Sequence, residues 1–533
     1  MEPADYEDFY RYTSGRWLWA EEPRLRERYK RFNVPGLKSI AAKTSGAQSC
    51  LTITKHAEGG FNKIFRLVMD NGCVVMARIP NPNVGPISKV MASEVATMDF
   101  VQNVIGIPGP RVLAWDGRKS NDAESEYMLM EEARGTQLEE LWADMELDDQ
   151  VSVVDDLVAI QKKLHSVNFS RYGSIYYRSD AFEGCSTFEV SGDLPQSAKT
   201  YAEDRFAIGP VAESALWETE SSSSFADRGP WLNAQDYLRA ISRRERAKLA
   251  RTDLSATEDD SDELESAQHR LALLDKFDAV SAYLPPSNTN LDKAALSHWD
   301  LRAPNIFVKD GRITSLIDWQ DNWVEPFFMQ EKRPQLIDYH GELMLRLPDD
   351  YETMQDKDEK KKVCNKVQKS LVYWRYGRQT QRQNPVLREL FDLPLARVRR
   401  ETVSFASNIS HGEALPLRES LYQLQQQWPN LQPGLPCPIT FTPEEISAHT
   451  RISAKWNDDV DFWSPLKGFV SRDGYVSNEN YDDARKFFAE LRDAGLEQFR
   501  GKELRDFEEG SRWAETGTRG LNGGSEERNY KLA

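Results

Sequence analysis

The sequence predicts an α+β protein with two lobes, a small lobe built on an antiparallel sheet and a larger, mainly helical lobe. Three runs rich in β-branched and apolar residues fill residues 51–80 and are separated by Gly59-Gly60 and by Asn71-Gly72. Asn-Gly between two apolar runs is the strongest short-range signal for a β-hairpin. The pattern downstream of this lobe is mainly helical. With 533 residues the chain is long enough to bury two cores.

Four parts of different composition are expected along the chain. They are an N-terminal helical extension (1–45), the small lobe (46–134), the larger lobe (135–508) and a disordered tail rich in Gly, Ser and Glu (509–533). Within the larger lobe, residues 245–270 are dense in charge and serine. Such a composition indicates a solvated or flexible loop.

Hydrophobic periodicity predicts the main elements of these parts. The expected elements are a charged helix at 20–32, a helix at 88–104, strands at 111–115 and 127–131, and an amphipathic helix at 150–166. His165 lies in the stripe of the last helix, so we expect it to pack in the core rather than to serve a site.

Bulk composition excludes several classes of partner. The formal net charge of −17 opposes non-specific binding of nucleic acid. No run of about 18 apolar residues is present, so no membrane span is expected. The five cysteines are scattered without paired spacing, which suits reduced thiols inside a cell.

The first residues give conflicting signals on localisation. Glu2, Asp5, Glu7 and Asp8 are acidic, which is unlike a transit peptide and favours the cytoplasm. The stretch 11–31 is richer in arginine and leaves import into an organelle open.

Residues 294–320 are expected to bring three oxygen-bearing side chains together. An Asp-Gly pair predicts the turn of a hairpin. Asn305 precedes the first strand of this hairpin and Asp318 follows the second, so both flank the same end of the paired strands. Asp300 lies on the loop that enters that end. We therefore expect the three side chains to converge.

Two carboxylates and an amide oxygen suit a magnesium ion. Mg²⁺ prefers oxygen ligands and usually takes one or two protein carboxylates, with phosphate and water completing its shell. Asn305 and Asp318 are the candidate metal ligands. Asp300 is then available to accept the proton of a substrate hydroxyl.

The segment from His298 to Asn305 resembles the catalytic-loop pattern His-x-Asp-(x4)-Asn of the aminoglycoside-phosphotransferase and choline-kinase family. Ile317-Asp318-Trp319 resembles the metal-binding Asp segment of the same family. The resemblance implies a two-lobed protein-kinase-like fold with ATP and Mg²⁺ as cofactors. It implies catalytic roles for Asp300, Arg302 and His298, in a reaction that is mostly positioning and charge neutralisation.

The resemblance extends upstream into the small lobe. Residues 58–63 (EGGFNK) are similar to the phosphate-covering turn of the family, and residues 127–132 look like the hinge that takes adenine. Arg78 stands where the family has its strand Lys or Arg, and Glu94 matches the helix Glu that pairs with it. The nucleotide contacts implied in this way are Gly59, Gly60, Asn62, Lys63, Arg78, Glu94 and Glu131.

Most of the chain, residues 8–510, is similar to fungal members of the phosphotransferase family. The segments that carry this similarity are RYTSGRWLW, EGGFNK, ARIPNPN, SEVATMDF, RYGSIYY and LIDWQ. It implies a mitochondrial location.

Several residues have a structural alternative. Asp300 could cap its own loop, Asn305 could be a turn residue, and Asp318 could cap a helix. His298 more often holds the loop by hydrogen bonds in this fold. Arg302 suits a γ-phosphate contact or a surface ion pair equally.

The small-lobe residues have alternatives as well. Gly59 and Gly60 lack full G-x-G-x-x-G spacing and could form a plain hairpin turn. Arg78 and Glu94 could form a surface salt bridge, and Arg differs from Lys in how it binds phosphate.

The predicted function is ATP- and Mg²⁺-dependent transfer of phosphate to a hydroxyl of a small molecule, whose identity no motif indicates. A protein kinase is less favoured, because no Ala-Pro-Glu segment follows Asp318. The alternative from another class is a catalytically silent kinase-fold protein that binds a nucleotide or a protein partner.

Overall fold

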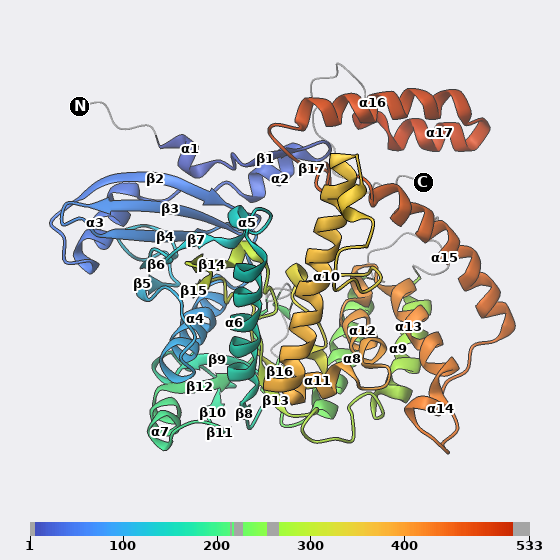
Figure 1. Cartoon of the computed structure of the whole chain (residues 1–533), viewed down its shortest axis with the longest axis horizontal. Helices are drawn as coiled ribbons and strands as arrows, with labels where there is room; N and C mark the ends of the chain where they lie inside the picture. Colours follow the sequence, from blue (N-terminus) through green and yellow to red (C-terminus); the bar gives the residue numbers. More distant parts are fainter. Residues whose placement is uncertain (1–5, 214–215, 218–226, 253–265, 515–533) are drawn as a thin grey trace. The chain divides into compact units, whose positions relative to one another are not determined.

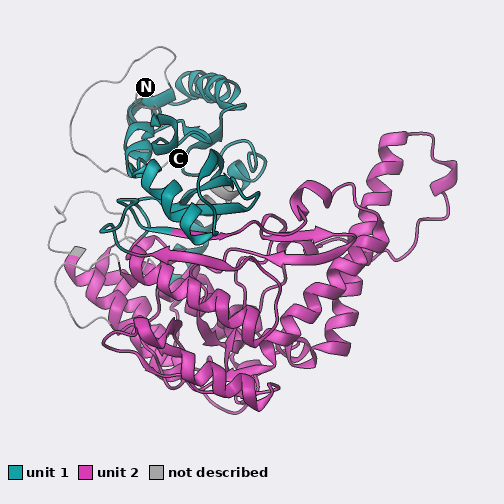
Figure 2. Ribbon diagram, turned by 90° about the vertical axis from the view of Figure 1, so that its left-hand side faces the viewer, with its two compact units in different colours: residues 1–84, 118–127, 443–533 teal, residues 85–117, 128–442 magenta. Residues whose placement is uncertain are grey.

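The computed structural model describes residues 6–213, 216–217, 227–252 and 266–514, and it shows an α+β protein with antiparallel sheets and many helices (Figure 1). Two compact units divide the chain (Figure 2). Unit 1 contains residues 1–84, 118–127 and 443–533, and unit 2 contains residues 85–117 and 128–442. The α+β class is therefore as predicted.

Unit 1 is built on three antiparallel strands. They are β2 (Cys50–Glu58), β3 (Asn62–Met69) and β4 (Val74–Pro80). Side chains alternate along β3, so that Phe65, Leu67 and Met69 are buried on one face. The predicted Asn-Gly hairpin joins β3 to β4, and Gly72 adopts a φ of +81° there. The strand predictions for this lobe are confirmed.

A helix packs on this sheet at the start of the chain. The helix α3 (Val34–Thr44) buries Val34, Leu37 and Ala41, and the side chain of Asn33 caps it by accepting from Gly36 N at 3.2 Å. The predicted charged helix at 20–32 is present as the shorter α2 (Glu21–Glu27).

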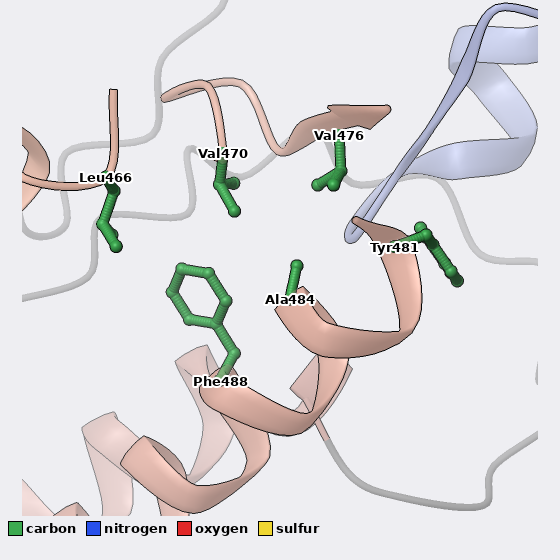
Figure 3. Close-up of a cluster of buried hydrophobic side chains, with 6 residues drawn as sticks. All are labelled: Leu466, Val470, Val476, Tyr481, Ala484 and Phe488. Atoms are coloured by element: carbon green, nitrogen blue, oxygen red, sulfur yellow. The ribbon is translucent and has the colours of Figure 1, made fainter. Parts of the chain in front are cut away.

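The C-terminal residues join the N-terminal ones inside unit 1. Strand β1 (Gly15–Trp17) pairs antiparallel with β17 (Tyr475–Ser477). The other C-terminal elements are α15 (Pro443–Trp463), α16 (Tyr481–Gln498), α17 (Gly501–Gly510) and a 3₁₀ turn (Arg512–Ala514). A separate hydrophobic cluster packs β17 and α16 together, with Leu466, Val470, Val476, Tyr481, Ala484 and Phe488 buried (Figure 3).

This arrangement changes two expectations. The predicted larger lobe ran without a break to residue 508, whereas the described residues 443–514 group with unit 1. Of the tail predicted to be disordered, residues 509–514 are ordered, because Trp513 packs on the aromatic rings of Trp19 and Phe488. Residues 515–533 lie outside the described residues.

Unit 2 begins with the predicted helix at 88–104. It forms as α4 (Ile87–Asp99), followed by a π-helical turn over Phe100–Val104. Strands β5 (Val112–Asp116) and β6 (Tyr127–Glu131) and the long helix α6 (Leu147–His165) are also where the sequence predicts them.

Three small antiparallel sheets follow in unit 2. One has the order β11-β8-β13-β16, the second β10-β12-β9 and the third β15-β14-β7. Their strands are β7 (Thr136–Gln137), β8 (Val167–Phe169), β9 (Ser174–Tyr177), β10 (Ser186–Thr187), β11 (Val190–Gly192), β12 (Phe206–Gly209), β13 (Ala294–Leu296), β14 (Ile306–Lys309), β15 (Arg312–Leu316) and β16 (Val324–Pro326).

Helices make up the rest of unit 2. They are α5 (Leu138–Leu141), α7 (Gln196–Arg205), α8 (Ala234–Thr252), α9 (Ala267–Ser281), α10 (Lys357–Gln383), α11 (Pro385–Phe391), α12 (Ala396–Ser407), α13 (Ala414–Gln426) and α14 (Trp428–Leu431). Helices α8 and α9 pack against each other. These helices include both ends of the loop that was predicted at 245–270, so the predicted bounds of the loop were too wide. Residues 253–265, between the two helices, lie outside the described residues.

Candidate active site

The predicted hairpin at 306–316 forms and sets the geometry of the site. Strands β14 and β15 pair with Ile306 opposite Leu316. Beyond this pair, Ile317 N donates to Asn305 O at 3.0 Å. Asn305 and Asp318 therefore flank the same end of the hairpin, as the sequence predicts.

Asp300 contacts Asn305 directly. Asn305 Nδ2 donates to Asp300 Oδ2 at 2.8 Å and to Asp300 O at 2.9 Å. Arg302 Nε donates to the same Oδ2 at 2.8 Å. The two hydrogen bonds to the Asp300 side chain therefore fall on the same carboxylate oxygen. With its nitrogen held by Asp300, Asn305 turns its amide oxygen away from that carboxylate.

Arg302 forms the ion pair that was one of its two predicted roles. Its side chain is about half exposed, at 47%, whereas that of Asp300 is 20% exposed. A contact between Arg302 and phosphate stays a prediction.

Asp318 has a left-handed backbone, with a φ of +66°. For residues with a Cβ this conformation costs roughly 1–2 kcal/mol, although Asp and Asn tolerate it best. A turn and then strand β16 follow Asp318, so no helix begins directly after it for it to cap. A strained residue at the end of a hairpin is typical of functional sites.

His298 is a buried support of the loop. Its Nε2 lies 2.9 Å from Ile317 O, and a carbonyl can only accept, so Nε2 carries the proton. The ring packs edge-on against Trp319 with centroids 4.6 Å apart. Burial lowers the pKa of His298. These contacts favour the loop-holding alternative.

Two residues that the sequence analysis did not single out also fix the catalytic loop. Asn322 Oδ1 accepts from Trp299 N at 3.0 Å, and Gln320 O accepts from Trp299 Nε1 at 3.0 Å. The only sequence signal for them is their position, just after Asp318 in the segment LIDWQDN.

The glycine pair lies in the turn between β2 and β3. The backbone conformation at these two positions does not require glycine. Neither Gly59 nor Gly60 has a positive φ, and a Cβ at either position would meet no atom within 4 Å. The carbonyl of Gly60 accepts from Asn81 Nδ2 and Asn83 Nδ2, both at 3.2 Å. Asn62 forms part of the same turn, since Gly59 N donates to Asn62 O at 2.9 Å.

Lys63 requires a correction. Its ammonium donates to Asn81 Oδ1 at 2.6 Å and to Arg28 O at 2.5 Å, and it lies 3.1 Å from Glu58 Oε1. The ammonium thus donates two hydrogen bonds to protein oxygens and pairs with a carboxylate, and the side chain is fully buried. Burial lowers the pKa of Lys63 to about 8. Lys63 supports the glycine turn from within instead of contacting a nucleotide.

The strand alternation explains this outcome. Lys63 lies at the same parity along β3 as Phe65, Leu67 and Met69, so its side chain points to their buried face. That signal was present in the sequence.

The other predicted nucleotide contacts lie in different units. Arg78 is buried on β4 in unit 1, and Glu94 is buried on α4 in unit 2. The pairing of these two residues stays a prediction. Glu131, at the end of β6, accepts from Arg111 Nε at 2.9 Å, and this ion pair lowers the pKa of Glu131.

His165 is a core residue, as predicted. Asn384 Nδ2 lies 3.0 Å from His165 Nδ1, and the ring of Phe327 packs on it at 4.8 Å.

Few side chains at the candidate site could bind a metal ion. Among the residues that the structure describes, no three or more His, Cys, Asp or Glu side chains cluster as a metal cage. Two carboxylates and one amide are compatible with Mg²⁺, which usually takes few protein ligands, and unlike a tetrahedral zinc site.

Comparison with known proteins defines the class. Residues 52–324, about half of the chain, match the model of the Phosphotransferase enzyme family (APH). The chain therefore belongs to this family and has its two-lobed, protein-kinase-like α+β fold. The family predicted from the catalytic loop is confirmed.

Two proteins with similar sequences come from fungi. A subtelomeric hrmA-associated cluster protein of Aspergillus fumigatus is 27% identical over 492 residues, covering 83% of this chain and 92% of that protein. Altered inheritance of mitochondria protein 9, mitochondrial, of Yarrowia lipolytica is 26% identical over 500 residues, covering 87% of this chain and 85% of that protein.

Solved structures are similar as well. A thermostable mutant of APH(4)-Ia in ternary complex with ADP and hygromycin B has a TM-score of 0.36 at 13% identity, covering 75% of this chain and 100% of that one. The gentamicin–APH(2″)-IIa complex has a TM-score of 0.35 at 13% identity, covering 73% and 95%.

Proposed function

We propose that this protein transfers the γ-phosphate of ATP, with Mg²⁺, to a hydroxyl group of a small molecule. The observation that carries the proposal is the convergence of Asp300, Asn305 and Asp318 at one end of the β14–β15 hairpin. Family membership supports the reaction class, and this geometry supports the roles of the residues.

Asp300 acts as the proton acceptor. Asn305 and Arg302 both bind its Oδ2, which orients the carboxylate and leaves Oδ1 for a substrate hydroxyl. The hydroxyl oxygen forms a bond to the γ-phosphorus, and the bond from that phosphorus to the bridging oxygen breaks. The bridging electron pair leaves with ADP, and the hydroxyl proton passes to Asp300.

Asn305 and Asp318 would hold the magnesium ion through oxygen atoms. When bound, the ion supplies positive charge that neutralises the phosphates. His298 keeps Asp318 in position through the carbonyl of Ile317.

The glycine turn would cover the phosphates. A Cβ at either glycine would neither strain the backbone nor contact other protein atoms. The lack of side chains there would let a ligand approach the backbone closely. This supports the phosphate role over a plain hairpin turn.

Asp300→Asn tests the proposal. The amide is nearly isosteric, so ATP affinity, measured from the rise in melting temperature with ATP and Mg²⁺, should barely change. Loss of the base should lower ATP hydrolysis or transfer at least about a hundredfold.

Asp310→Asn is the matched control, since Asp310 lies exposed in the turn at the other end of the same hairpin and should keep full turnover. Unchanged turnover in Asp300→Asn would remove the catalytic assignment and favour a silent nucleotide-binding protein.

A mitochondrial location is proposed from the name of the Yarrowia lipolytica relative. Within the described part of the chain, no helix is long and apolar enough to cross a membrane. Microscopy of the full chain fused at its C-terminus to a fluorescent protein tests the location, and a diffuse cytoplasmic signal would contradict it.

A further inference from the structure

Trp299, the residue before Asp300, is held by the segment that follows Asp318. Its backbone N–H donates to Asn322 Oδ1 at 3.0 Å, and its indole Nε1 donates to Gln320 O at 3.0 Å. Asn322 Nδ2 donates to the same Gln320 carbonyl at 3.2 Å. Trp299, Gln320 and Asn322 thus form a closed set of three hydrogen bonds, the Trp299 clamp.

Two consecutive residues of the catalytic loop hold carbonyl groups on either side of Asp318. His298 binds Ile317 O, and Trp299 binds Gln320 O. The residue that follows them in the chain is the proposed base. These contacts therefore fix the separation between the base and the candidate metal ligand.

The segment that the clamp holds has a strained backbone. Asp318 has a φ of +66° and Asp321 has a φ of +58°. Left-handed conformations are unfavourable for residues with a Cβ, and they persist where surrounding contacts determine them. The clamp supplies such contacts at Gln320 and Asn322, on both sides of Asp321. It therefore helps to keep the segment after the metal ligand in its strained form.

Burial holds only one side of the clamp. Asn322 is 3% exposed, whereas Trp299 is 53% exposed. An indole that is half exposed gains less from packing than a core side chain does, so its hydrogen bonds hold it in place. Trp299 thus connects the two segments and adds little to the core.

We infer that Trp299 and Asn322 are positioning residues for phosphate transfer, and that they act through Asp300 by fixing its distance from a metal held at Asp318. The inference rests on the proposed function. The substrate hydroxyl at Asp300 must meet a γ-phosphorus that the metal orients, and a misplacement of about 1 Å can lower such a rate about a hundredfold.

Two variants break different bonds of the clamp. Trp299→Phe removes the indole N–H and keeps an aromatic ring at a half-exposed position. Asn322→Leu is close in size to the amide and removes both hydrogen bonds of the Asn322 side chain. Asn384→Leu is the matched control, because Asn384 is 2% exposed and its side chain binds His165, outside the catalytic hairpin. Thermal melting measures the stability of each variant.

Hydrogen exchange without nucleotide tests the connection itself. Exchange should rise at residues 319–323 in Trp299→Phe and at residues 299–302 in Asn322→Leu. Strand β14 should stay protected in both variants, and Asn384→Leu should change neither segment. Unchanged exchange in both segments would show that the clamp does not join them and would overturn the inference.

Turnover tests the positioning role, with ATP hydrolysis as the measured reaction. At saturating ATP and Mg²⁺, Asn322→Leu should lower the rate about tenfold or more, and Trp299→Phe should lower it at least about threefold. The rise in melting temperature with ATP and Mg²⁺ should remain, because Asp318 keeps its carboxylate. Asn384→Leu should keep full turnover at temperatures at which it is folded.

The Asp300→Asn background shows whether the effect passes through Asp300. Residues that act through one group give non-additive losses. Asn322→Leu should therefore lower the residual ATP hydrolysis of Asp300→Asn by less than about twofold. The full loss in this background, or turnover within about twofold of the wild type in both single variants, would overturn the positioning role.

These measurements separate the inference from the proposed function. A wild type that hydrolyses ATP, with clamp variants that match it, would contradict the positioning role alone. A wild type without turnover would contradict the proposed function and the positioning role together, and the exchange experiment would still decide whether the clamp joins the two segments.

Discussion

Asp318 combines a left-handed backbone with the proposed metal contact. An Asp residue with a left-handed backbone can be replaced by Asn at small structural cost, because Asn tolerates this backbone conformation about as well as Asp does. Replacement by Ala adds a backbone penalty. The two substitutions therefore distinguish loss of the carboxylate from loss of stability.

Asp318→Asn should abolish the rise in melting temperature that Mg²⁺ with ATP produces, with little change in the melting temperature of the free protein. Asp318→Ala should lose the same response and also about 1 kcal/mol of stability. Asp310→Asn shares the left-handed backbone and should keep the response. If Asp318→Asn retains the full rise, Asp318 is not the metal ligand.

His165 should make stability sensitive to acid. Burial lowers the pKa of His165 to about 3 in the folded protein, whereas an unfolded chain has a His pKa of about 6.5. The folded state thus disfavours the proton. The contribution of neutral His165 to the free energy of unfolding is fully present above pH about 6.5. It is lost as the pH falls toward 3, by about 1.4 kcal/mol per pH unit.

Urea unfolding at pH 7 and pH 5 measures this effect. The wild type should lose about 2 kcal/mol more than His165→Gln over this interval. Equal losses in the two proteins would show that His165 does not hold a depressed pKa.

The hairpin between β2 and β3 has two kinds of glycine position nearby. Gly72, in the next turn, has a φ of +81° and needs glycine for its conformation. Gly59 and Gly60 lack this requirement, and their contact with phosphate is the proposal that the variants below test.

Opposite results are therefore expected for the two turns. The double substitution Gly59→Ala and Gly60→Ala should change the free energy of unfolding by no more than about 0.5 kcal/mol but weaken ATP binding about tenfold or more. Gly72→Ala should destabilise by about 1–2 kcal/mol and leave ATP affinity unchanged. Normal ATP binding in the double variant would identify residues 59–60 as a plain hairpin turn.

On the scale of the whole molecule, the described N-terminal and C-terminal segments fold together in unit 1. Strand β1 pairs with β17, Trp17 Nε1 donates to Asp473 Oδ2 at 3.1 Å, and Trp19 packs on Phe488. The N-terminal segment also reaches the glycine turn, since Thr13 N donates to Glu58 Oε2 at 2.7 Å. The C-terminal cluster thus supports a segment that holds the end of β2 next to the glycine turn.

Phe488→Ala should destabilise unit 1 by about 3–5 kcal/mol, because Phe488 is 2% exposed in the cluster of Figure 3. Hydrogen exchange should rise in β1 as well as in α16. Phe487→Ala is the matched control, since Phe487 is 37% exposed, and it should have a much smaller effect. Faster exchange in α16 alone would show that β1 does not depend on the cluster.

Local patterns in the sequence determined much of this protein. The Asn71-Gly72 turn, the alternation along residues 62–69 and the spacing from Asp300 to Asn305 each depend on neighbours in the chain, so they could be predicted without a structure. The hairpin that aligns Asn305 with Asp318 is of the same kind.

Only the tertiary structure decided the contacts between residues distant in sequence. The alternation along β3 already directs Lys63 to the buried face, but the tertiary structure supplied its partners Asn81 and Arg28 O. It also brought residues 463–514 to the N-terminal aromatics. No local period records such contacts, because side chains from separate elements meet only after the elements pack.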